Sequence, residues 1–311
     1  MKAVALTEFG EPDVLSVQDL PEPLVGPDVV LVEVRAAGVN PVDFKIRQGH
    51  LRGAFPHHTP LIPGWDAAGV VRAAGPAVRD YRVGDEVLGY VREDHVQHGT
   101  YAELVAAPER TLAHKPAGLG FDRAAALPLA GLTALQTLNA VRVGRGDTVL
   151  VHAAAGGVGH LGVQIAQQLG ASRVLGTASE RNHAFLRELG AQPVTYGPEL
   201  AERVAELVGG DGKVDAVVDF AGGRALQDSP GLVREVSRHG SVLDAQTALG
   251  QGGQYVFVRP DSQQLAWLAD LAARDALRVE LARELPLDEA AAAHRLLEDG
   301  HVRGKVVLTP R

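Results

Sequence analysis

Asp147-Thr148-Val149-Leu150-Val151-His152-Ala153-Ala154-Ala155-Gly156-Gly157-Val158-Gly159 is the most informative stretch in this chain of 311 residues. It predicts an apolar strand, then a glycine-rich turn, then a helix that runs to Leu169 and stops at Gly170. A glycine pattern alone is weak evidence. A strand before it and a helix after it are the context in which such a turn binds a dinucleotide pyrophosphate. We therefore predict a dinucleotide site, with a structural turn that holds no ligand as the alternative.

The glycines of this turn follow the dinucleotide fingerprint with one departure. Ala154 stands at the first glycine position, whereas Gly156 and Gly159 stand at the second and third. The absent side chains let the backbone approach the pyrophosphate, and the N–H groups near Val158 face it from the helix N-terminus. The loop residues expected to contact the cofactor are Ala155, Gly156, Gly157, Val158 and Gly159.

Beyond this stretch, the chain after Phe121 alternates apolar strands with helices. Strands are expected at Asp147–His152, Arg173–Thr177, Pro193–Tyr196, Val214–Asp219, Gly240–Leu243 and Tyr255–Val258. Strands and helices that alternate in this way form a parallel sheet, and this number of strands completes a doubly wound nucleotide-binding fold.

The segments on either side of this region have other patterns. Residues 1 to 120 contain short apolar strands broken by glycine and proline, which is typical of a compact, barrel-like β domain. The tail predicts helices at Ser262–Ala273 and Leu287–Leu297 and a last strand at Lys305–Leu308. Such an ending is compatible with a chain that folds back onto the N-terminal domain.

The residues after the second predicted strand indicate which dinucleotide binds. NAD sites place an acidic residue about 20 positions past the glycines, where it bonds the ribose 2′-hydroxyl. Here that position holds Ser179, and Arg181 follows it. A carboxylate would repel a 2′-phosphate by roughly 4 kcal/mol at 4 Å, so this pair favours NADPH. Glu180 opposes this interpretation unless it points away, and Arg181 as a solvated helix charge is the alternative.

Composition excludes several classes of function. A net charge of −8 argues against a general nucleic-acid surface, which needs a basic footprint. No apolar run has the ~18 residues that a membrane-spanning helix needs. The N-terminal segment Met1–Leu6 lacks a secretory pattern, so we expect a cytoplasmic protein. With a nucleic-acid surface and a membrane span not expected, the partner we expect is a small molecule.

Metal and thiol chemistry are not expected. The chain has no cysteine, which excludes disulfides, thiolate nucleophiles and any zinc site that uses sulfur. His57, His58, His95 and His98 are not followed by a matching ligand at an obvious spacing. We interpret them as histidines of water-exposed loops.

Taken together, several segments resemble the zinc-free quinone oxidoreductase and enone reductase branch of the medium-chain dehydrogenase/reductase family, which includes the zeta-crystallins. The segments are Ala36–Lys45, Pro63–Gly69, Val83–Val87, Leu127–Ala134, the glycine loop and Gly304–Leu308. The resemblance implies a GroES-like catalytic domain (residues 1–121 and 261–311) and a Rossmann domain (residues 122–260). It also implies that catalysis takes place in a cleft between these domains.

The resemblance also bears on the metal. Zinc-dependent members of the family carry a cysteine and a His-Glu pair where this chain has Asn40 and Trp65-Asp66. Without these ligands no Lewis acid would stabilise an alkoxide, so alcohol oxidation is not expected. A quinone or a conjugated enone suits such a site better, because the negative charge left after hydride transfer spreads onto a carbonyl oxygen.

The resemblance assigns roles to individual residues. Asn40, Asp43 and Lys45 are implied to line the nicotinamide and substrate pocket, and their motif is closer to the enone and alkenal reductases. Cofactor contacts are implied for Thr133, Tyr196 and Lys305. Asp43 as a helix cap is an alternative, and so is Thr133 as a helix residue whose hydroxyl bonds a backbone carbonyl.

An NADPH-dependent reductase of quinones or α,β-unsaturated carbonyls is the leading hypothesis. A dinucleotide-binding sensor or structural protein with little turnover is the second, and an enoyl-thioester reductase is the third. We also expect a homodimer, because the apolar strand Tyr255–Val258 is predicted at a sheet edge, where an unpaired strand invites a partner.

Overall fold

The computed structural model describes residues 1–310, which divide into two compact units. Unit 1 contains Met1–Leu129 and the segment from Pro260 onward, and unit 2 is Ala130–Arg259. The dividing point after Leu129 comes later than the predicted boundary at residue 121. The sequence pattern changes at helix α2 (Phe121–Ala126), but that helix packs on strands of unit 1.

Unit 2 is built on a six-stranded sheet in the order β12-β11-β10-β13-β14-β15, with every neighbouring pair parallel. This is the predicted doubly wound fold. The order reverses at β10, so the carboxyl ends of β10 and its neighbours form the edge where such sheets bind ligands. The strands are β10 (Thr148–Val151), β11 (Arg173–Thr177), β12 (Gln192–Val194), β13 (Ala216–Asp219), β14 (His239–Ser241) and β15 (Gln254–Tyr255).

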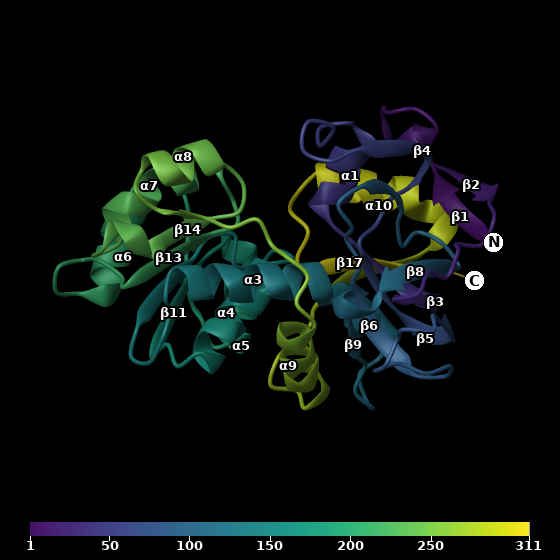
Figure 1. Cartoon of the computed structure of the whole chain (residues 1–311). Helices are drawn as coiled ribbons and strands as arrows, with labels where there is room; N and C mark the ends of the chain where they lie inside the picture. Colours follow the sequence, from purple (N-terminus) through teal and green to yellow (C-terminus); the bar gives the residue numbers. More distant parts are fainter. Residues whose placement is uncertain (311) are drawn as a thin grey trace. The chain divides into compact units, whose positions relative to one another are not determined.

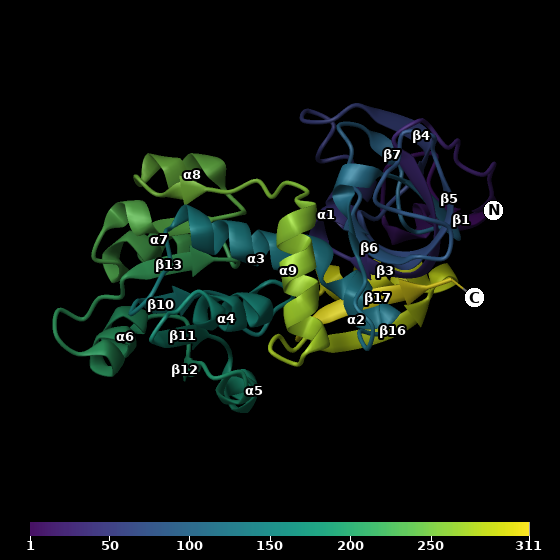
Figure 2. The same cartoon turned by 60° about the horizontal axis from the view of Figure 1, so that its bottom comes forward.

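Helices cover both faces of this sheet, with α7 and α8 on one side and α4 and α5 on the other (Figure 2). The central strands β10 and β13 are almost wholly buried, which is why their sequences are nearly continuous apolar runs. The helical segments are α4 (Gly159–Gln168), η3 (Glu180–Asn182), α5 (His183–Glu188), α6 (Leu200–Val208), α7 (Gly223–Leu232), η4 (Val236–Arg238) and α8 (Ala245–Gly250). Helix α3 (Pro128–Ala140) begins in unit 1 and continues into unit 2.

The edge strand β15 differs from its prediction. It was expected at Tyr255–Val258, but it contains only Gln254–Tyr255. The N–H of Val256 still donates to Ser241 O at 3.0 Å, and the chain then leaves the sheet, with Phe257 half exposed. β15 is therefore an edge strand as predicted, but it is shorter than predicted.

Unit 1 contains a seven-stranded sheet in which β16-β17-β3-β5-β6-β9 follow one another and β8 also pairs with β3. The last strand β17 lies antiparallel to β3 (Figure 1), as a tail that folds back requires. Two small sheets, β1-β2 and β4-β7, complete the unit. The strands are β1 (Lys2–Ala5), β2 (Ser16–Asp19), β3 (Val29–Val39), β4 (His57–Ile62), β5 (Asp66–Ala74), β6 (Glu86–Tyr90), β7 (Val96–His98), β8 (Leu104–Pro108), β9 (Leu112–His114), β16 (Leu281–Pro286) and β17 (Lys305–Thr309).

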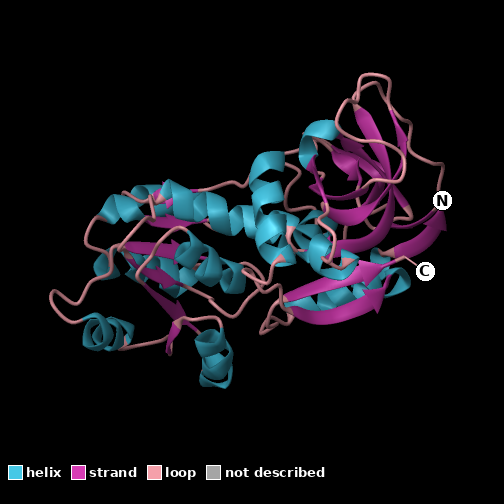
Figure 3. Ribbon diagram, turned by 90° about the horizontal axis from the view of Figure 1, so that it is seen from below, coloured by secondary structure: helices cyan, strands magenta, loops and turns pink. Residues whose placement is uncertain are grey.

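The structure contains helices as well as strands throughout the described residues (Figure 3), and in unit 1 the helical segments are short except for α9 (Ser262–Ala273). The others are η1 (Pro12–Val14), α1 (Pro41–Arg47), η2 (Glu109–Thr111), α2, η5 (Leu287–Glu289) and α10 (Ala290–Glu298). The core combines apolar residues of both chain segments, for example Val34, Tyr101, Leu287 and Leu308. Along residues 1–310, no helix has the length and apolar character to cross a membrane.

Candidate functional site

The glycine-rich turn lies between β10 and α4, at the carboxyl edge of the unit 2 sheet. Its third glycine is required by close packing, since a Cβ on Gly159 would lie 2.2 Å from Ala153 O. The start of α4 leaves the N–H groups of Val158 and Gly159 without acceptors inside the helix. A tight turn with free N–H groups at a helix N-terminus can bind an anionic pyrophosphate.

The alanine at the first glycine position is accommodated by its neighbour on β11. Ala154 is fully buried, and a Cβ added at Gly176 would lie 2.7 Å from the Ala154 methyl. Gly176 therefore provides the space that the methyl group of Ala154 occupies. This departure from the fingerprint leaves the turn intact.

The residues predicted to select the dinucleotide lie at the same edge. Ser179 follows β11 and occupies the N-cap position of the short helix η3 without a side-chain capping bond, and η3 contains the exposed Arg181. Tyr196 follows β12 and is 54% exposed. The N–H of Ala178 donates to Val194 O at 3.0 Å and joins the ends of these two strands. The structure thus brings the glycine loop, Ser179, Arg181 and Tyr196 to one edge of one sheet.

Thr133 lies in α3 and is buried, at 4% exposure. Its hydroxyl has no hydrogen-bond partner within residues 1–310, so the alternative of a bond to a helix carbonyl is wrong. Instead Thr137 Oγ1 donates to Thr133 O at 2.7 Å. A buried hydroxyl without a protein partner is uncommon and suits a contact with a ligand.

A second polar cluster lies inside unit 1, where β3 meets α1. Asn40 is 1% exposed, and both ends of its side chain are used. Asn40 Oδ1 accepts from Lys305 Nζ, and Asn40 Nδ2 donates to Asp66 Oδ2 at 2.9 Å. Lys305 also donates to Val39 O at 3.0 Å. These bonds join the C-terminal strand β17, the end of β3 and the start of β5.

Charge is balanced only in part within this cluster. Burial raises the pKa of Asp66 to about 6 against the opposing effects of Lys305, Asn40 and the N–H of Leu129. Burial lowers the pKa of Lys305, and Asp66 and Asp43 oppose this. Two carboxyl groups therefore face one ammonium group in a site from which water is excluded.

Asp43 is the most deeply placed of the predicted catalytic residues, with no exposed surface. Its Oδ2 accepts from the N–H of Asn40 at 2.8 Å and from Tyr101 Oη at 3.0 Å, whereas Oδ1 has no partner among the described residues. Burial raises the pKa of Asp43 to about 7, although the Asn40 hydrogen bond lowers it. Asp43 is the third residue of α1 and accepts from the N–H of the N-cap residue Asn40, so it stabilises the start of its own helix and does not cap a following one.

Lys45 differs from Asn40 and Asp43. It lies on the same helix α1 but is partly exposed, and residues 1–310 offer its ammonium group no hydrogen bond or ion pair. Asn40, Asp43 and Lys305 are enclosed by protein in this structure, so direct contact with a substrate or cofactor is not what their geometry indicates. They hold the backbone around α1, and Lys45 is the accessible residue of the predicted catalytic set.

Three residues with buried polar contacts were not predicted as site residues. Tyr101 Oη lies 3.3 Å from His294 Nε2, and these residues are 193 positions apart in the sequence. Burial and the charge of Arg47 lower the pKa of His294 to about 3, so its ring is neutral. Asp66 had a local signal, an acid at the start of an apolar strand, whereas Tyr101 and His294 had none.

The histidines interpreted as exposed loop residues lie on or next to the paired strands β4 and β7. His58 and His98 are exposed as expected, but His57 and His95 are partly buried. The rings of His58 and His95 are 6.2 Å apart. Residues 1–310 contain no group of three His, Asp or Glu side chains placed to hold a metal ion.

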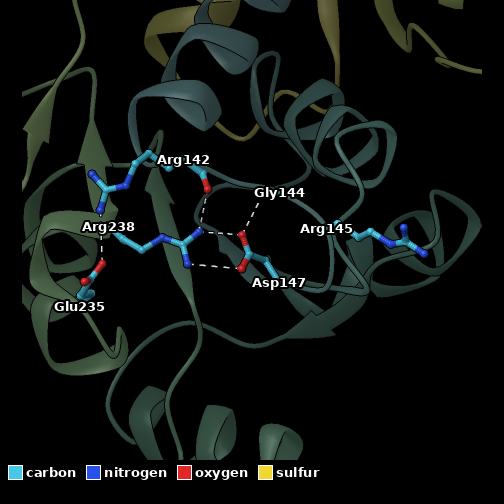
Figure 4. A pocket seen from close by; sticks show the side chains of 6 residues that line it. All are labelled: Arg142, Gly144, Arg145, Asp147, Glu235 and Arg238. Carbon is cyan, nitrogen blue, oxygen red and sulfur yellow. Dashed lines mark hydrogen bonds and ion pairs between the residues drawn. The ribbon is translucent and has the colours of Figure 1, made fainter.

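A surface hollow at the amino-terminal edge of the unit 2 sheet is lined by Arg142, Gly144, Arg145, Asp147, Glu235 and Arg238. Figure 4 shows Arg238 aimed at the Asp147 carboxylate, which it meets at 2.6 Å, while Arg145 extends away. Arg238 also donates to Arg142 O at 2.9 Å. Arg142 pairs with Glu235 and Arg238 with Asp147, so these two ion pairs stabilise the strand ends opposite the glycine loop.

Comparison with known proteins agrees with this architecture. The alcohol dehydrogenase GroES-like domain matches residues 26–117, and the zinc-binding dehydrogenase family matches residues 189–308. The chain is 34% identical to the 2-methylene-furan-3-one reductase of Solanum lycopersicum, covering 100% of this chain and 79% of that protein. This chain belongs to the medium-chain dehydrogenase/reductase family.

Two further relatives place this medium-chain reductase in the quinone oxidoreductase branch. It is 35% identical to an NADPH-dependent alkenal/one oxidoreductase of Arabidopsis thaliana, covering 100% of this chain and 80% of that protein. The quinone oxidoreductase of Coxiella burnetii is 39% identical, with a TM-score of 0.88 over 100% of this chain and 99% of that one. The predicted family and its two-domain fold are confirmed.

Proposed function

We propose that this medium-chain reductase is an NADPH-dependent reductase of quinones or α,β-unsaturated carbonyl compounds. The observation that carries the proposal is the glycine loop of unit 2, which shares one sheet edge with Ser179, Arg181 and Tyr196. The residues after β11 offer a 2′-phosphate the hydroxyl of Ser179 and the exposed guanidinium group of Arg181, with Glu180 as the neighbouring carboxylate. The reactions named for the two plant relatives fit a protein of this kind.

The residues present suit a bound dinucleotide. Gly159 leaves no room for a Cβ, which keeps the turn tight, and the helix N-terminus behind it offers free N–H groups. The unpartnered Thr133 hydroxyl would hold a polar group of the nicotinamide half. When bound, NADPH supplies the hydride.

The protein's own contribution is to stabilise the charge that develops on the substrate. Hydride transfer to the β-carbon leaves negative charge on the carbonyl oxygen, and one donor aimed there is typically worth ~3–4 kcal/mol. We propose Lys45 as this donor, because it is the accessible cation on α1, next to the buried Asn40 and Asp43. The alternatives for Lys45 are a solvated lysine and a lysine that contacts a cofactor phosphate.

The catalytic and the cofactor-binding roles of Lys45 differ kinetically. If Lys45 polarises the carbonyl, Lys45→Ala lowers kcat by roughly 10²–10³ while the NADPH dissociation constant changes little. If Lys45 holds the cofactor, binding weakens and kcat at saturating NADPH hardly changes. Single-turnover hydride transfer at saturating NADPH separates the two, and a wild-type rate in the variant rejects catalysis by Lys45.

The proposed function is tested by NADPH consumption against a panel of quinones, enones and enoyl thioesters, before and after exhaustive chelation. We expect turnover with quinones or enones that survives chelation. Preference for thioesters would favour an enoyl-thioester reductase. NADPH binding without turnover on any acceptor would favour a sensor or structural protein. If metal analysis finds one zinc ion per chain and its removal abolishes activity, the zinc-independent reaction is contradicted.

We further propose a homodimer that pairs through β15. This strand lies at the edge of the sheet, and Leu243, Leu249 and Phe257 nearby are 43%, 59% and 50% exposed. An unpaired edge with apolar neighbours favours a second copy of the chain. Light scattering at micromolar concentration is expected to give the dimer mass, and a monomer mass would reject the proposal. The cytoplasmic location stays a prediction from the sequence.

A further inference from the structure

The turn between β10 and α4 begins with a residue in an unfavourable backbone conformation. Ala153 has a φ of +52°, in the left-handed region that glycine adopts readily and alanine does not. Residues held in this region at a binding site persist only where the surrounding structure fixes them. Contacts that fix Ala153 are therefore expected.

Thr177, the last residue of β11, makes those contacts from a buried position with 2% exposure. Its Oγ1 accepts from the N–H of Ala153 at 3.2 Å, and its main-chain O accepts from the N–H of Ala154 at 3.0 Å. These two N–H groups belong to the peptide planes on either side of the Ala153 Cα. One residue thus holds both planes and, with them, the φ and ψ angles of Ala153.

His152 supports the Thr177 hydroxyl. Its Nδ1 lies 3.3 Å from Thr177 Oγ1, and the side chain has no exposed surface. Burial lowers the pKa of His152 to about 4, against the opposing charges of Asp219 and Asp228, so the ring is neutral at physiological pH. A neutral ring nitrogen can accept the Thr177 hydroxyl proton while the same oxygen accepts from Ala153.

The position of Ala153 is transmitted to the phosphate-binding turn through its carbonyl group. Ala153 O accepts from the N–H of Gly156 at 2.9 Å, and a Cβ on Gly159 would lie 2.2 Å from that oxygen. The second and third glycines of the fingerprint, Gly156 and Gly159, therefore both contact the carbonyl oxygen of Ala153. A rotation at Ala153 would move the turn away from the N-terminus of α4.

We propose that Thr177, oriented by His152, is a positioning residue that sets the dinucleotide-binding turn through Ala153. The inference rests on the proposed binding of a dinucleotide. Thr177 is proposed to affect the binding of the pyrophosphate, which NADPH and NADH share. Arg181 is proposed to affect only the 2′-phosphate, which NADPH alone carries.

The test is fluorescence titration of the full chain with NADPH and NADH, with melting temperatures measured in parallel. Thr177→Val keeps the shape of the side chain but removes the acceptor, and is expected to weaken both dinucleotides by the same factor, about tenfold. Thr177→Ser retains the hydroxyl and is expected to bind within about twofold of wild type. Equal loss in Thr177→Ser and Thr177→Val would overturn the proposal.

The double variant Thr177→Val with Ala153→Gly tests the route through Ala153. Glycine adopts a φ near +52° without the steric penalty, so the double variant is expected to recover most of the lost affinity. Unrecovered affinity in the double variant, no loss of affinity in Thr177→Val, or a loss confined to NADPH would each overturn the proposal.

If Thr177→Val does not fold, His152→Leu replaces it in the titration. We expect this variant to bind both dinucleotides about threefold more weakly. Unchanged binding in His152→Leu would overturn the proposal.

The failure of this inference can be told from the failure of the proposed function. Wild-type protein that binds neither dinucleotide rejects both. Wild-type protein that binds NADPH, with binding unchanged in Thr177→Val, rejects only the role of Thr177.

Discussion

The ammonium group of Lys305 donates a hydrogen bond to the side-chain oxygen of Asn40, across 265 residues of sequence. This bond attaches the C-terminal strand to the start of helix α1. Both residues are buried, and the Asn40 side chain also donates a hydrogen bond from Nδ2 to Asp66 Oδ2 at 2.9 Å. The tail of the chain is therefore part of the structure that supports the predicted catalytic segment.

Lys305→Met is expected to lower the free energy of unfolding by about 3–5 kcal/mol, because it leaves buried carboxyl groups without their cation. Lys45→Met is the matched control, since the Lys45 ammonium is partly exposed and has no ion pair within residues 1–310. A change within about 0.5 kcal/mol is expected there. Urea unfolding of both variants measures the difference, and equal effects would contradict the assigned burial of Lys305.

Asp43→Asn is expected to change how stability depends on pH. The pKa of Asp43 is about 7 in the fold and 3.8 when unperturbed, so between these values the folded state binds more protons than the unfolded chain. The contribution of Asp43 to stability is therefore complete below pH 4 and is lost as the pH rises towards 7.

Because asparagine does not ionise, the stability of Asp43→Asn relative to wild type should rise with pH over this range, by at most about 1.4 kcal/mol per pH unit. Urea unfolding at several pH values measures this slope. Parallel stability curves for the two proteins would show that Asp43 is not held in a buried site.

Gly159→Ala is expected to disrupt the phosphate-binding turn, because the new methyl would lie 2.2 Å from Ala153 O. We expect at least about tenfold weaker binding of both dinucleotides, since a small displacement of a binding turn is costly. The overpacked site should also lose about 1–3 kcal/mol of stability. Gly231→Ala is the control, because no atom lies within 4 Å of the added Cβ. Titration and unfolding that do not distinguish the two variants would reject the packing role of Gly159.

Arg181→Ala is expected to weaken NADPH by roughly 1–3 kcal/mol, the value of a charge-assisted hydrogen bond, and to leave NADH nearly unchanged. Glu180→Gln is the neighbouring control and should keep or improve NADPH binding, because it removes a negative charge. Fluorescence titration with both dinucleotides measures the selectivity. Equal losses for NADPH and NADH in Arg181→Ala would contradict a 2′-phosphate contact.

The doubly wound sheet could be predicted because its signals are local. Each strand is a short apolar run, and Gly156, Gly159 and Gly170 mark the turns and helix ends next to it. Several strands were predicted too long: Pro193–Tyr196 and Gly240–Leu243 end two residues earlier in the structure, and Tyr255–Val258 is apolar at a position where the chain has already left the sheet. Hydrophobicity alone does not mark that departure.

The buried cluster of unit 1 could be predicted only in part. The sequence pointed to Asn40, Asp43 and Lys305, but their enclosure depends on contacts between segments far apart in the chain. Tyr101 and His294 show the limit, because no local pattern relates residues 193 positions apart. The same holds for Thr177 in unit 2, which looks like an ordinary strand residue until its hydroxyl is seen at the Ala153 N–H.

The most direct test of the proposed reaction follows the hydride itself. NADPH that carries deuterium at the transferable position of C4 is incubated with the protein and a simple enone, and the product is examined by NMR and mass spectrometry. We expect one deuterium on the β-carbon of the saturated ketone, with a proton from water on the α-carbon. A reduced product without deuterium at the β-carbon, or the absence of reduced product at saturating NADPH with every quinone and enone tried, would contradict the proposed function.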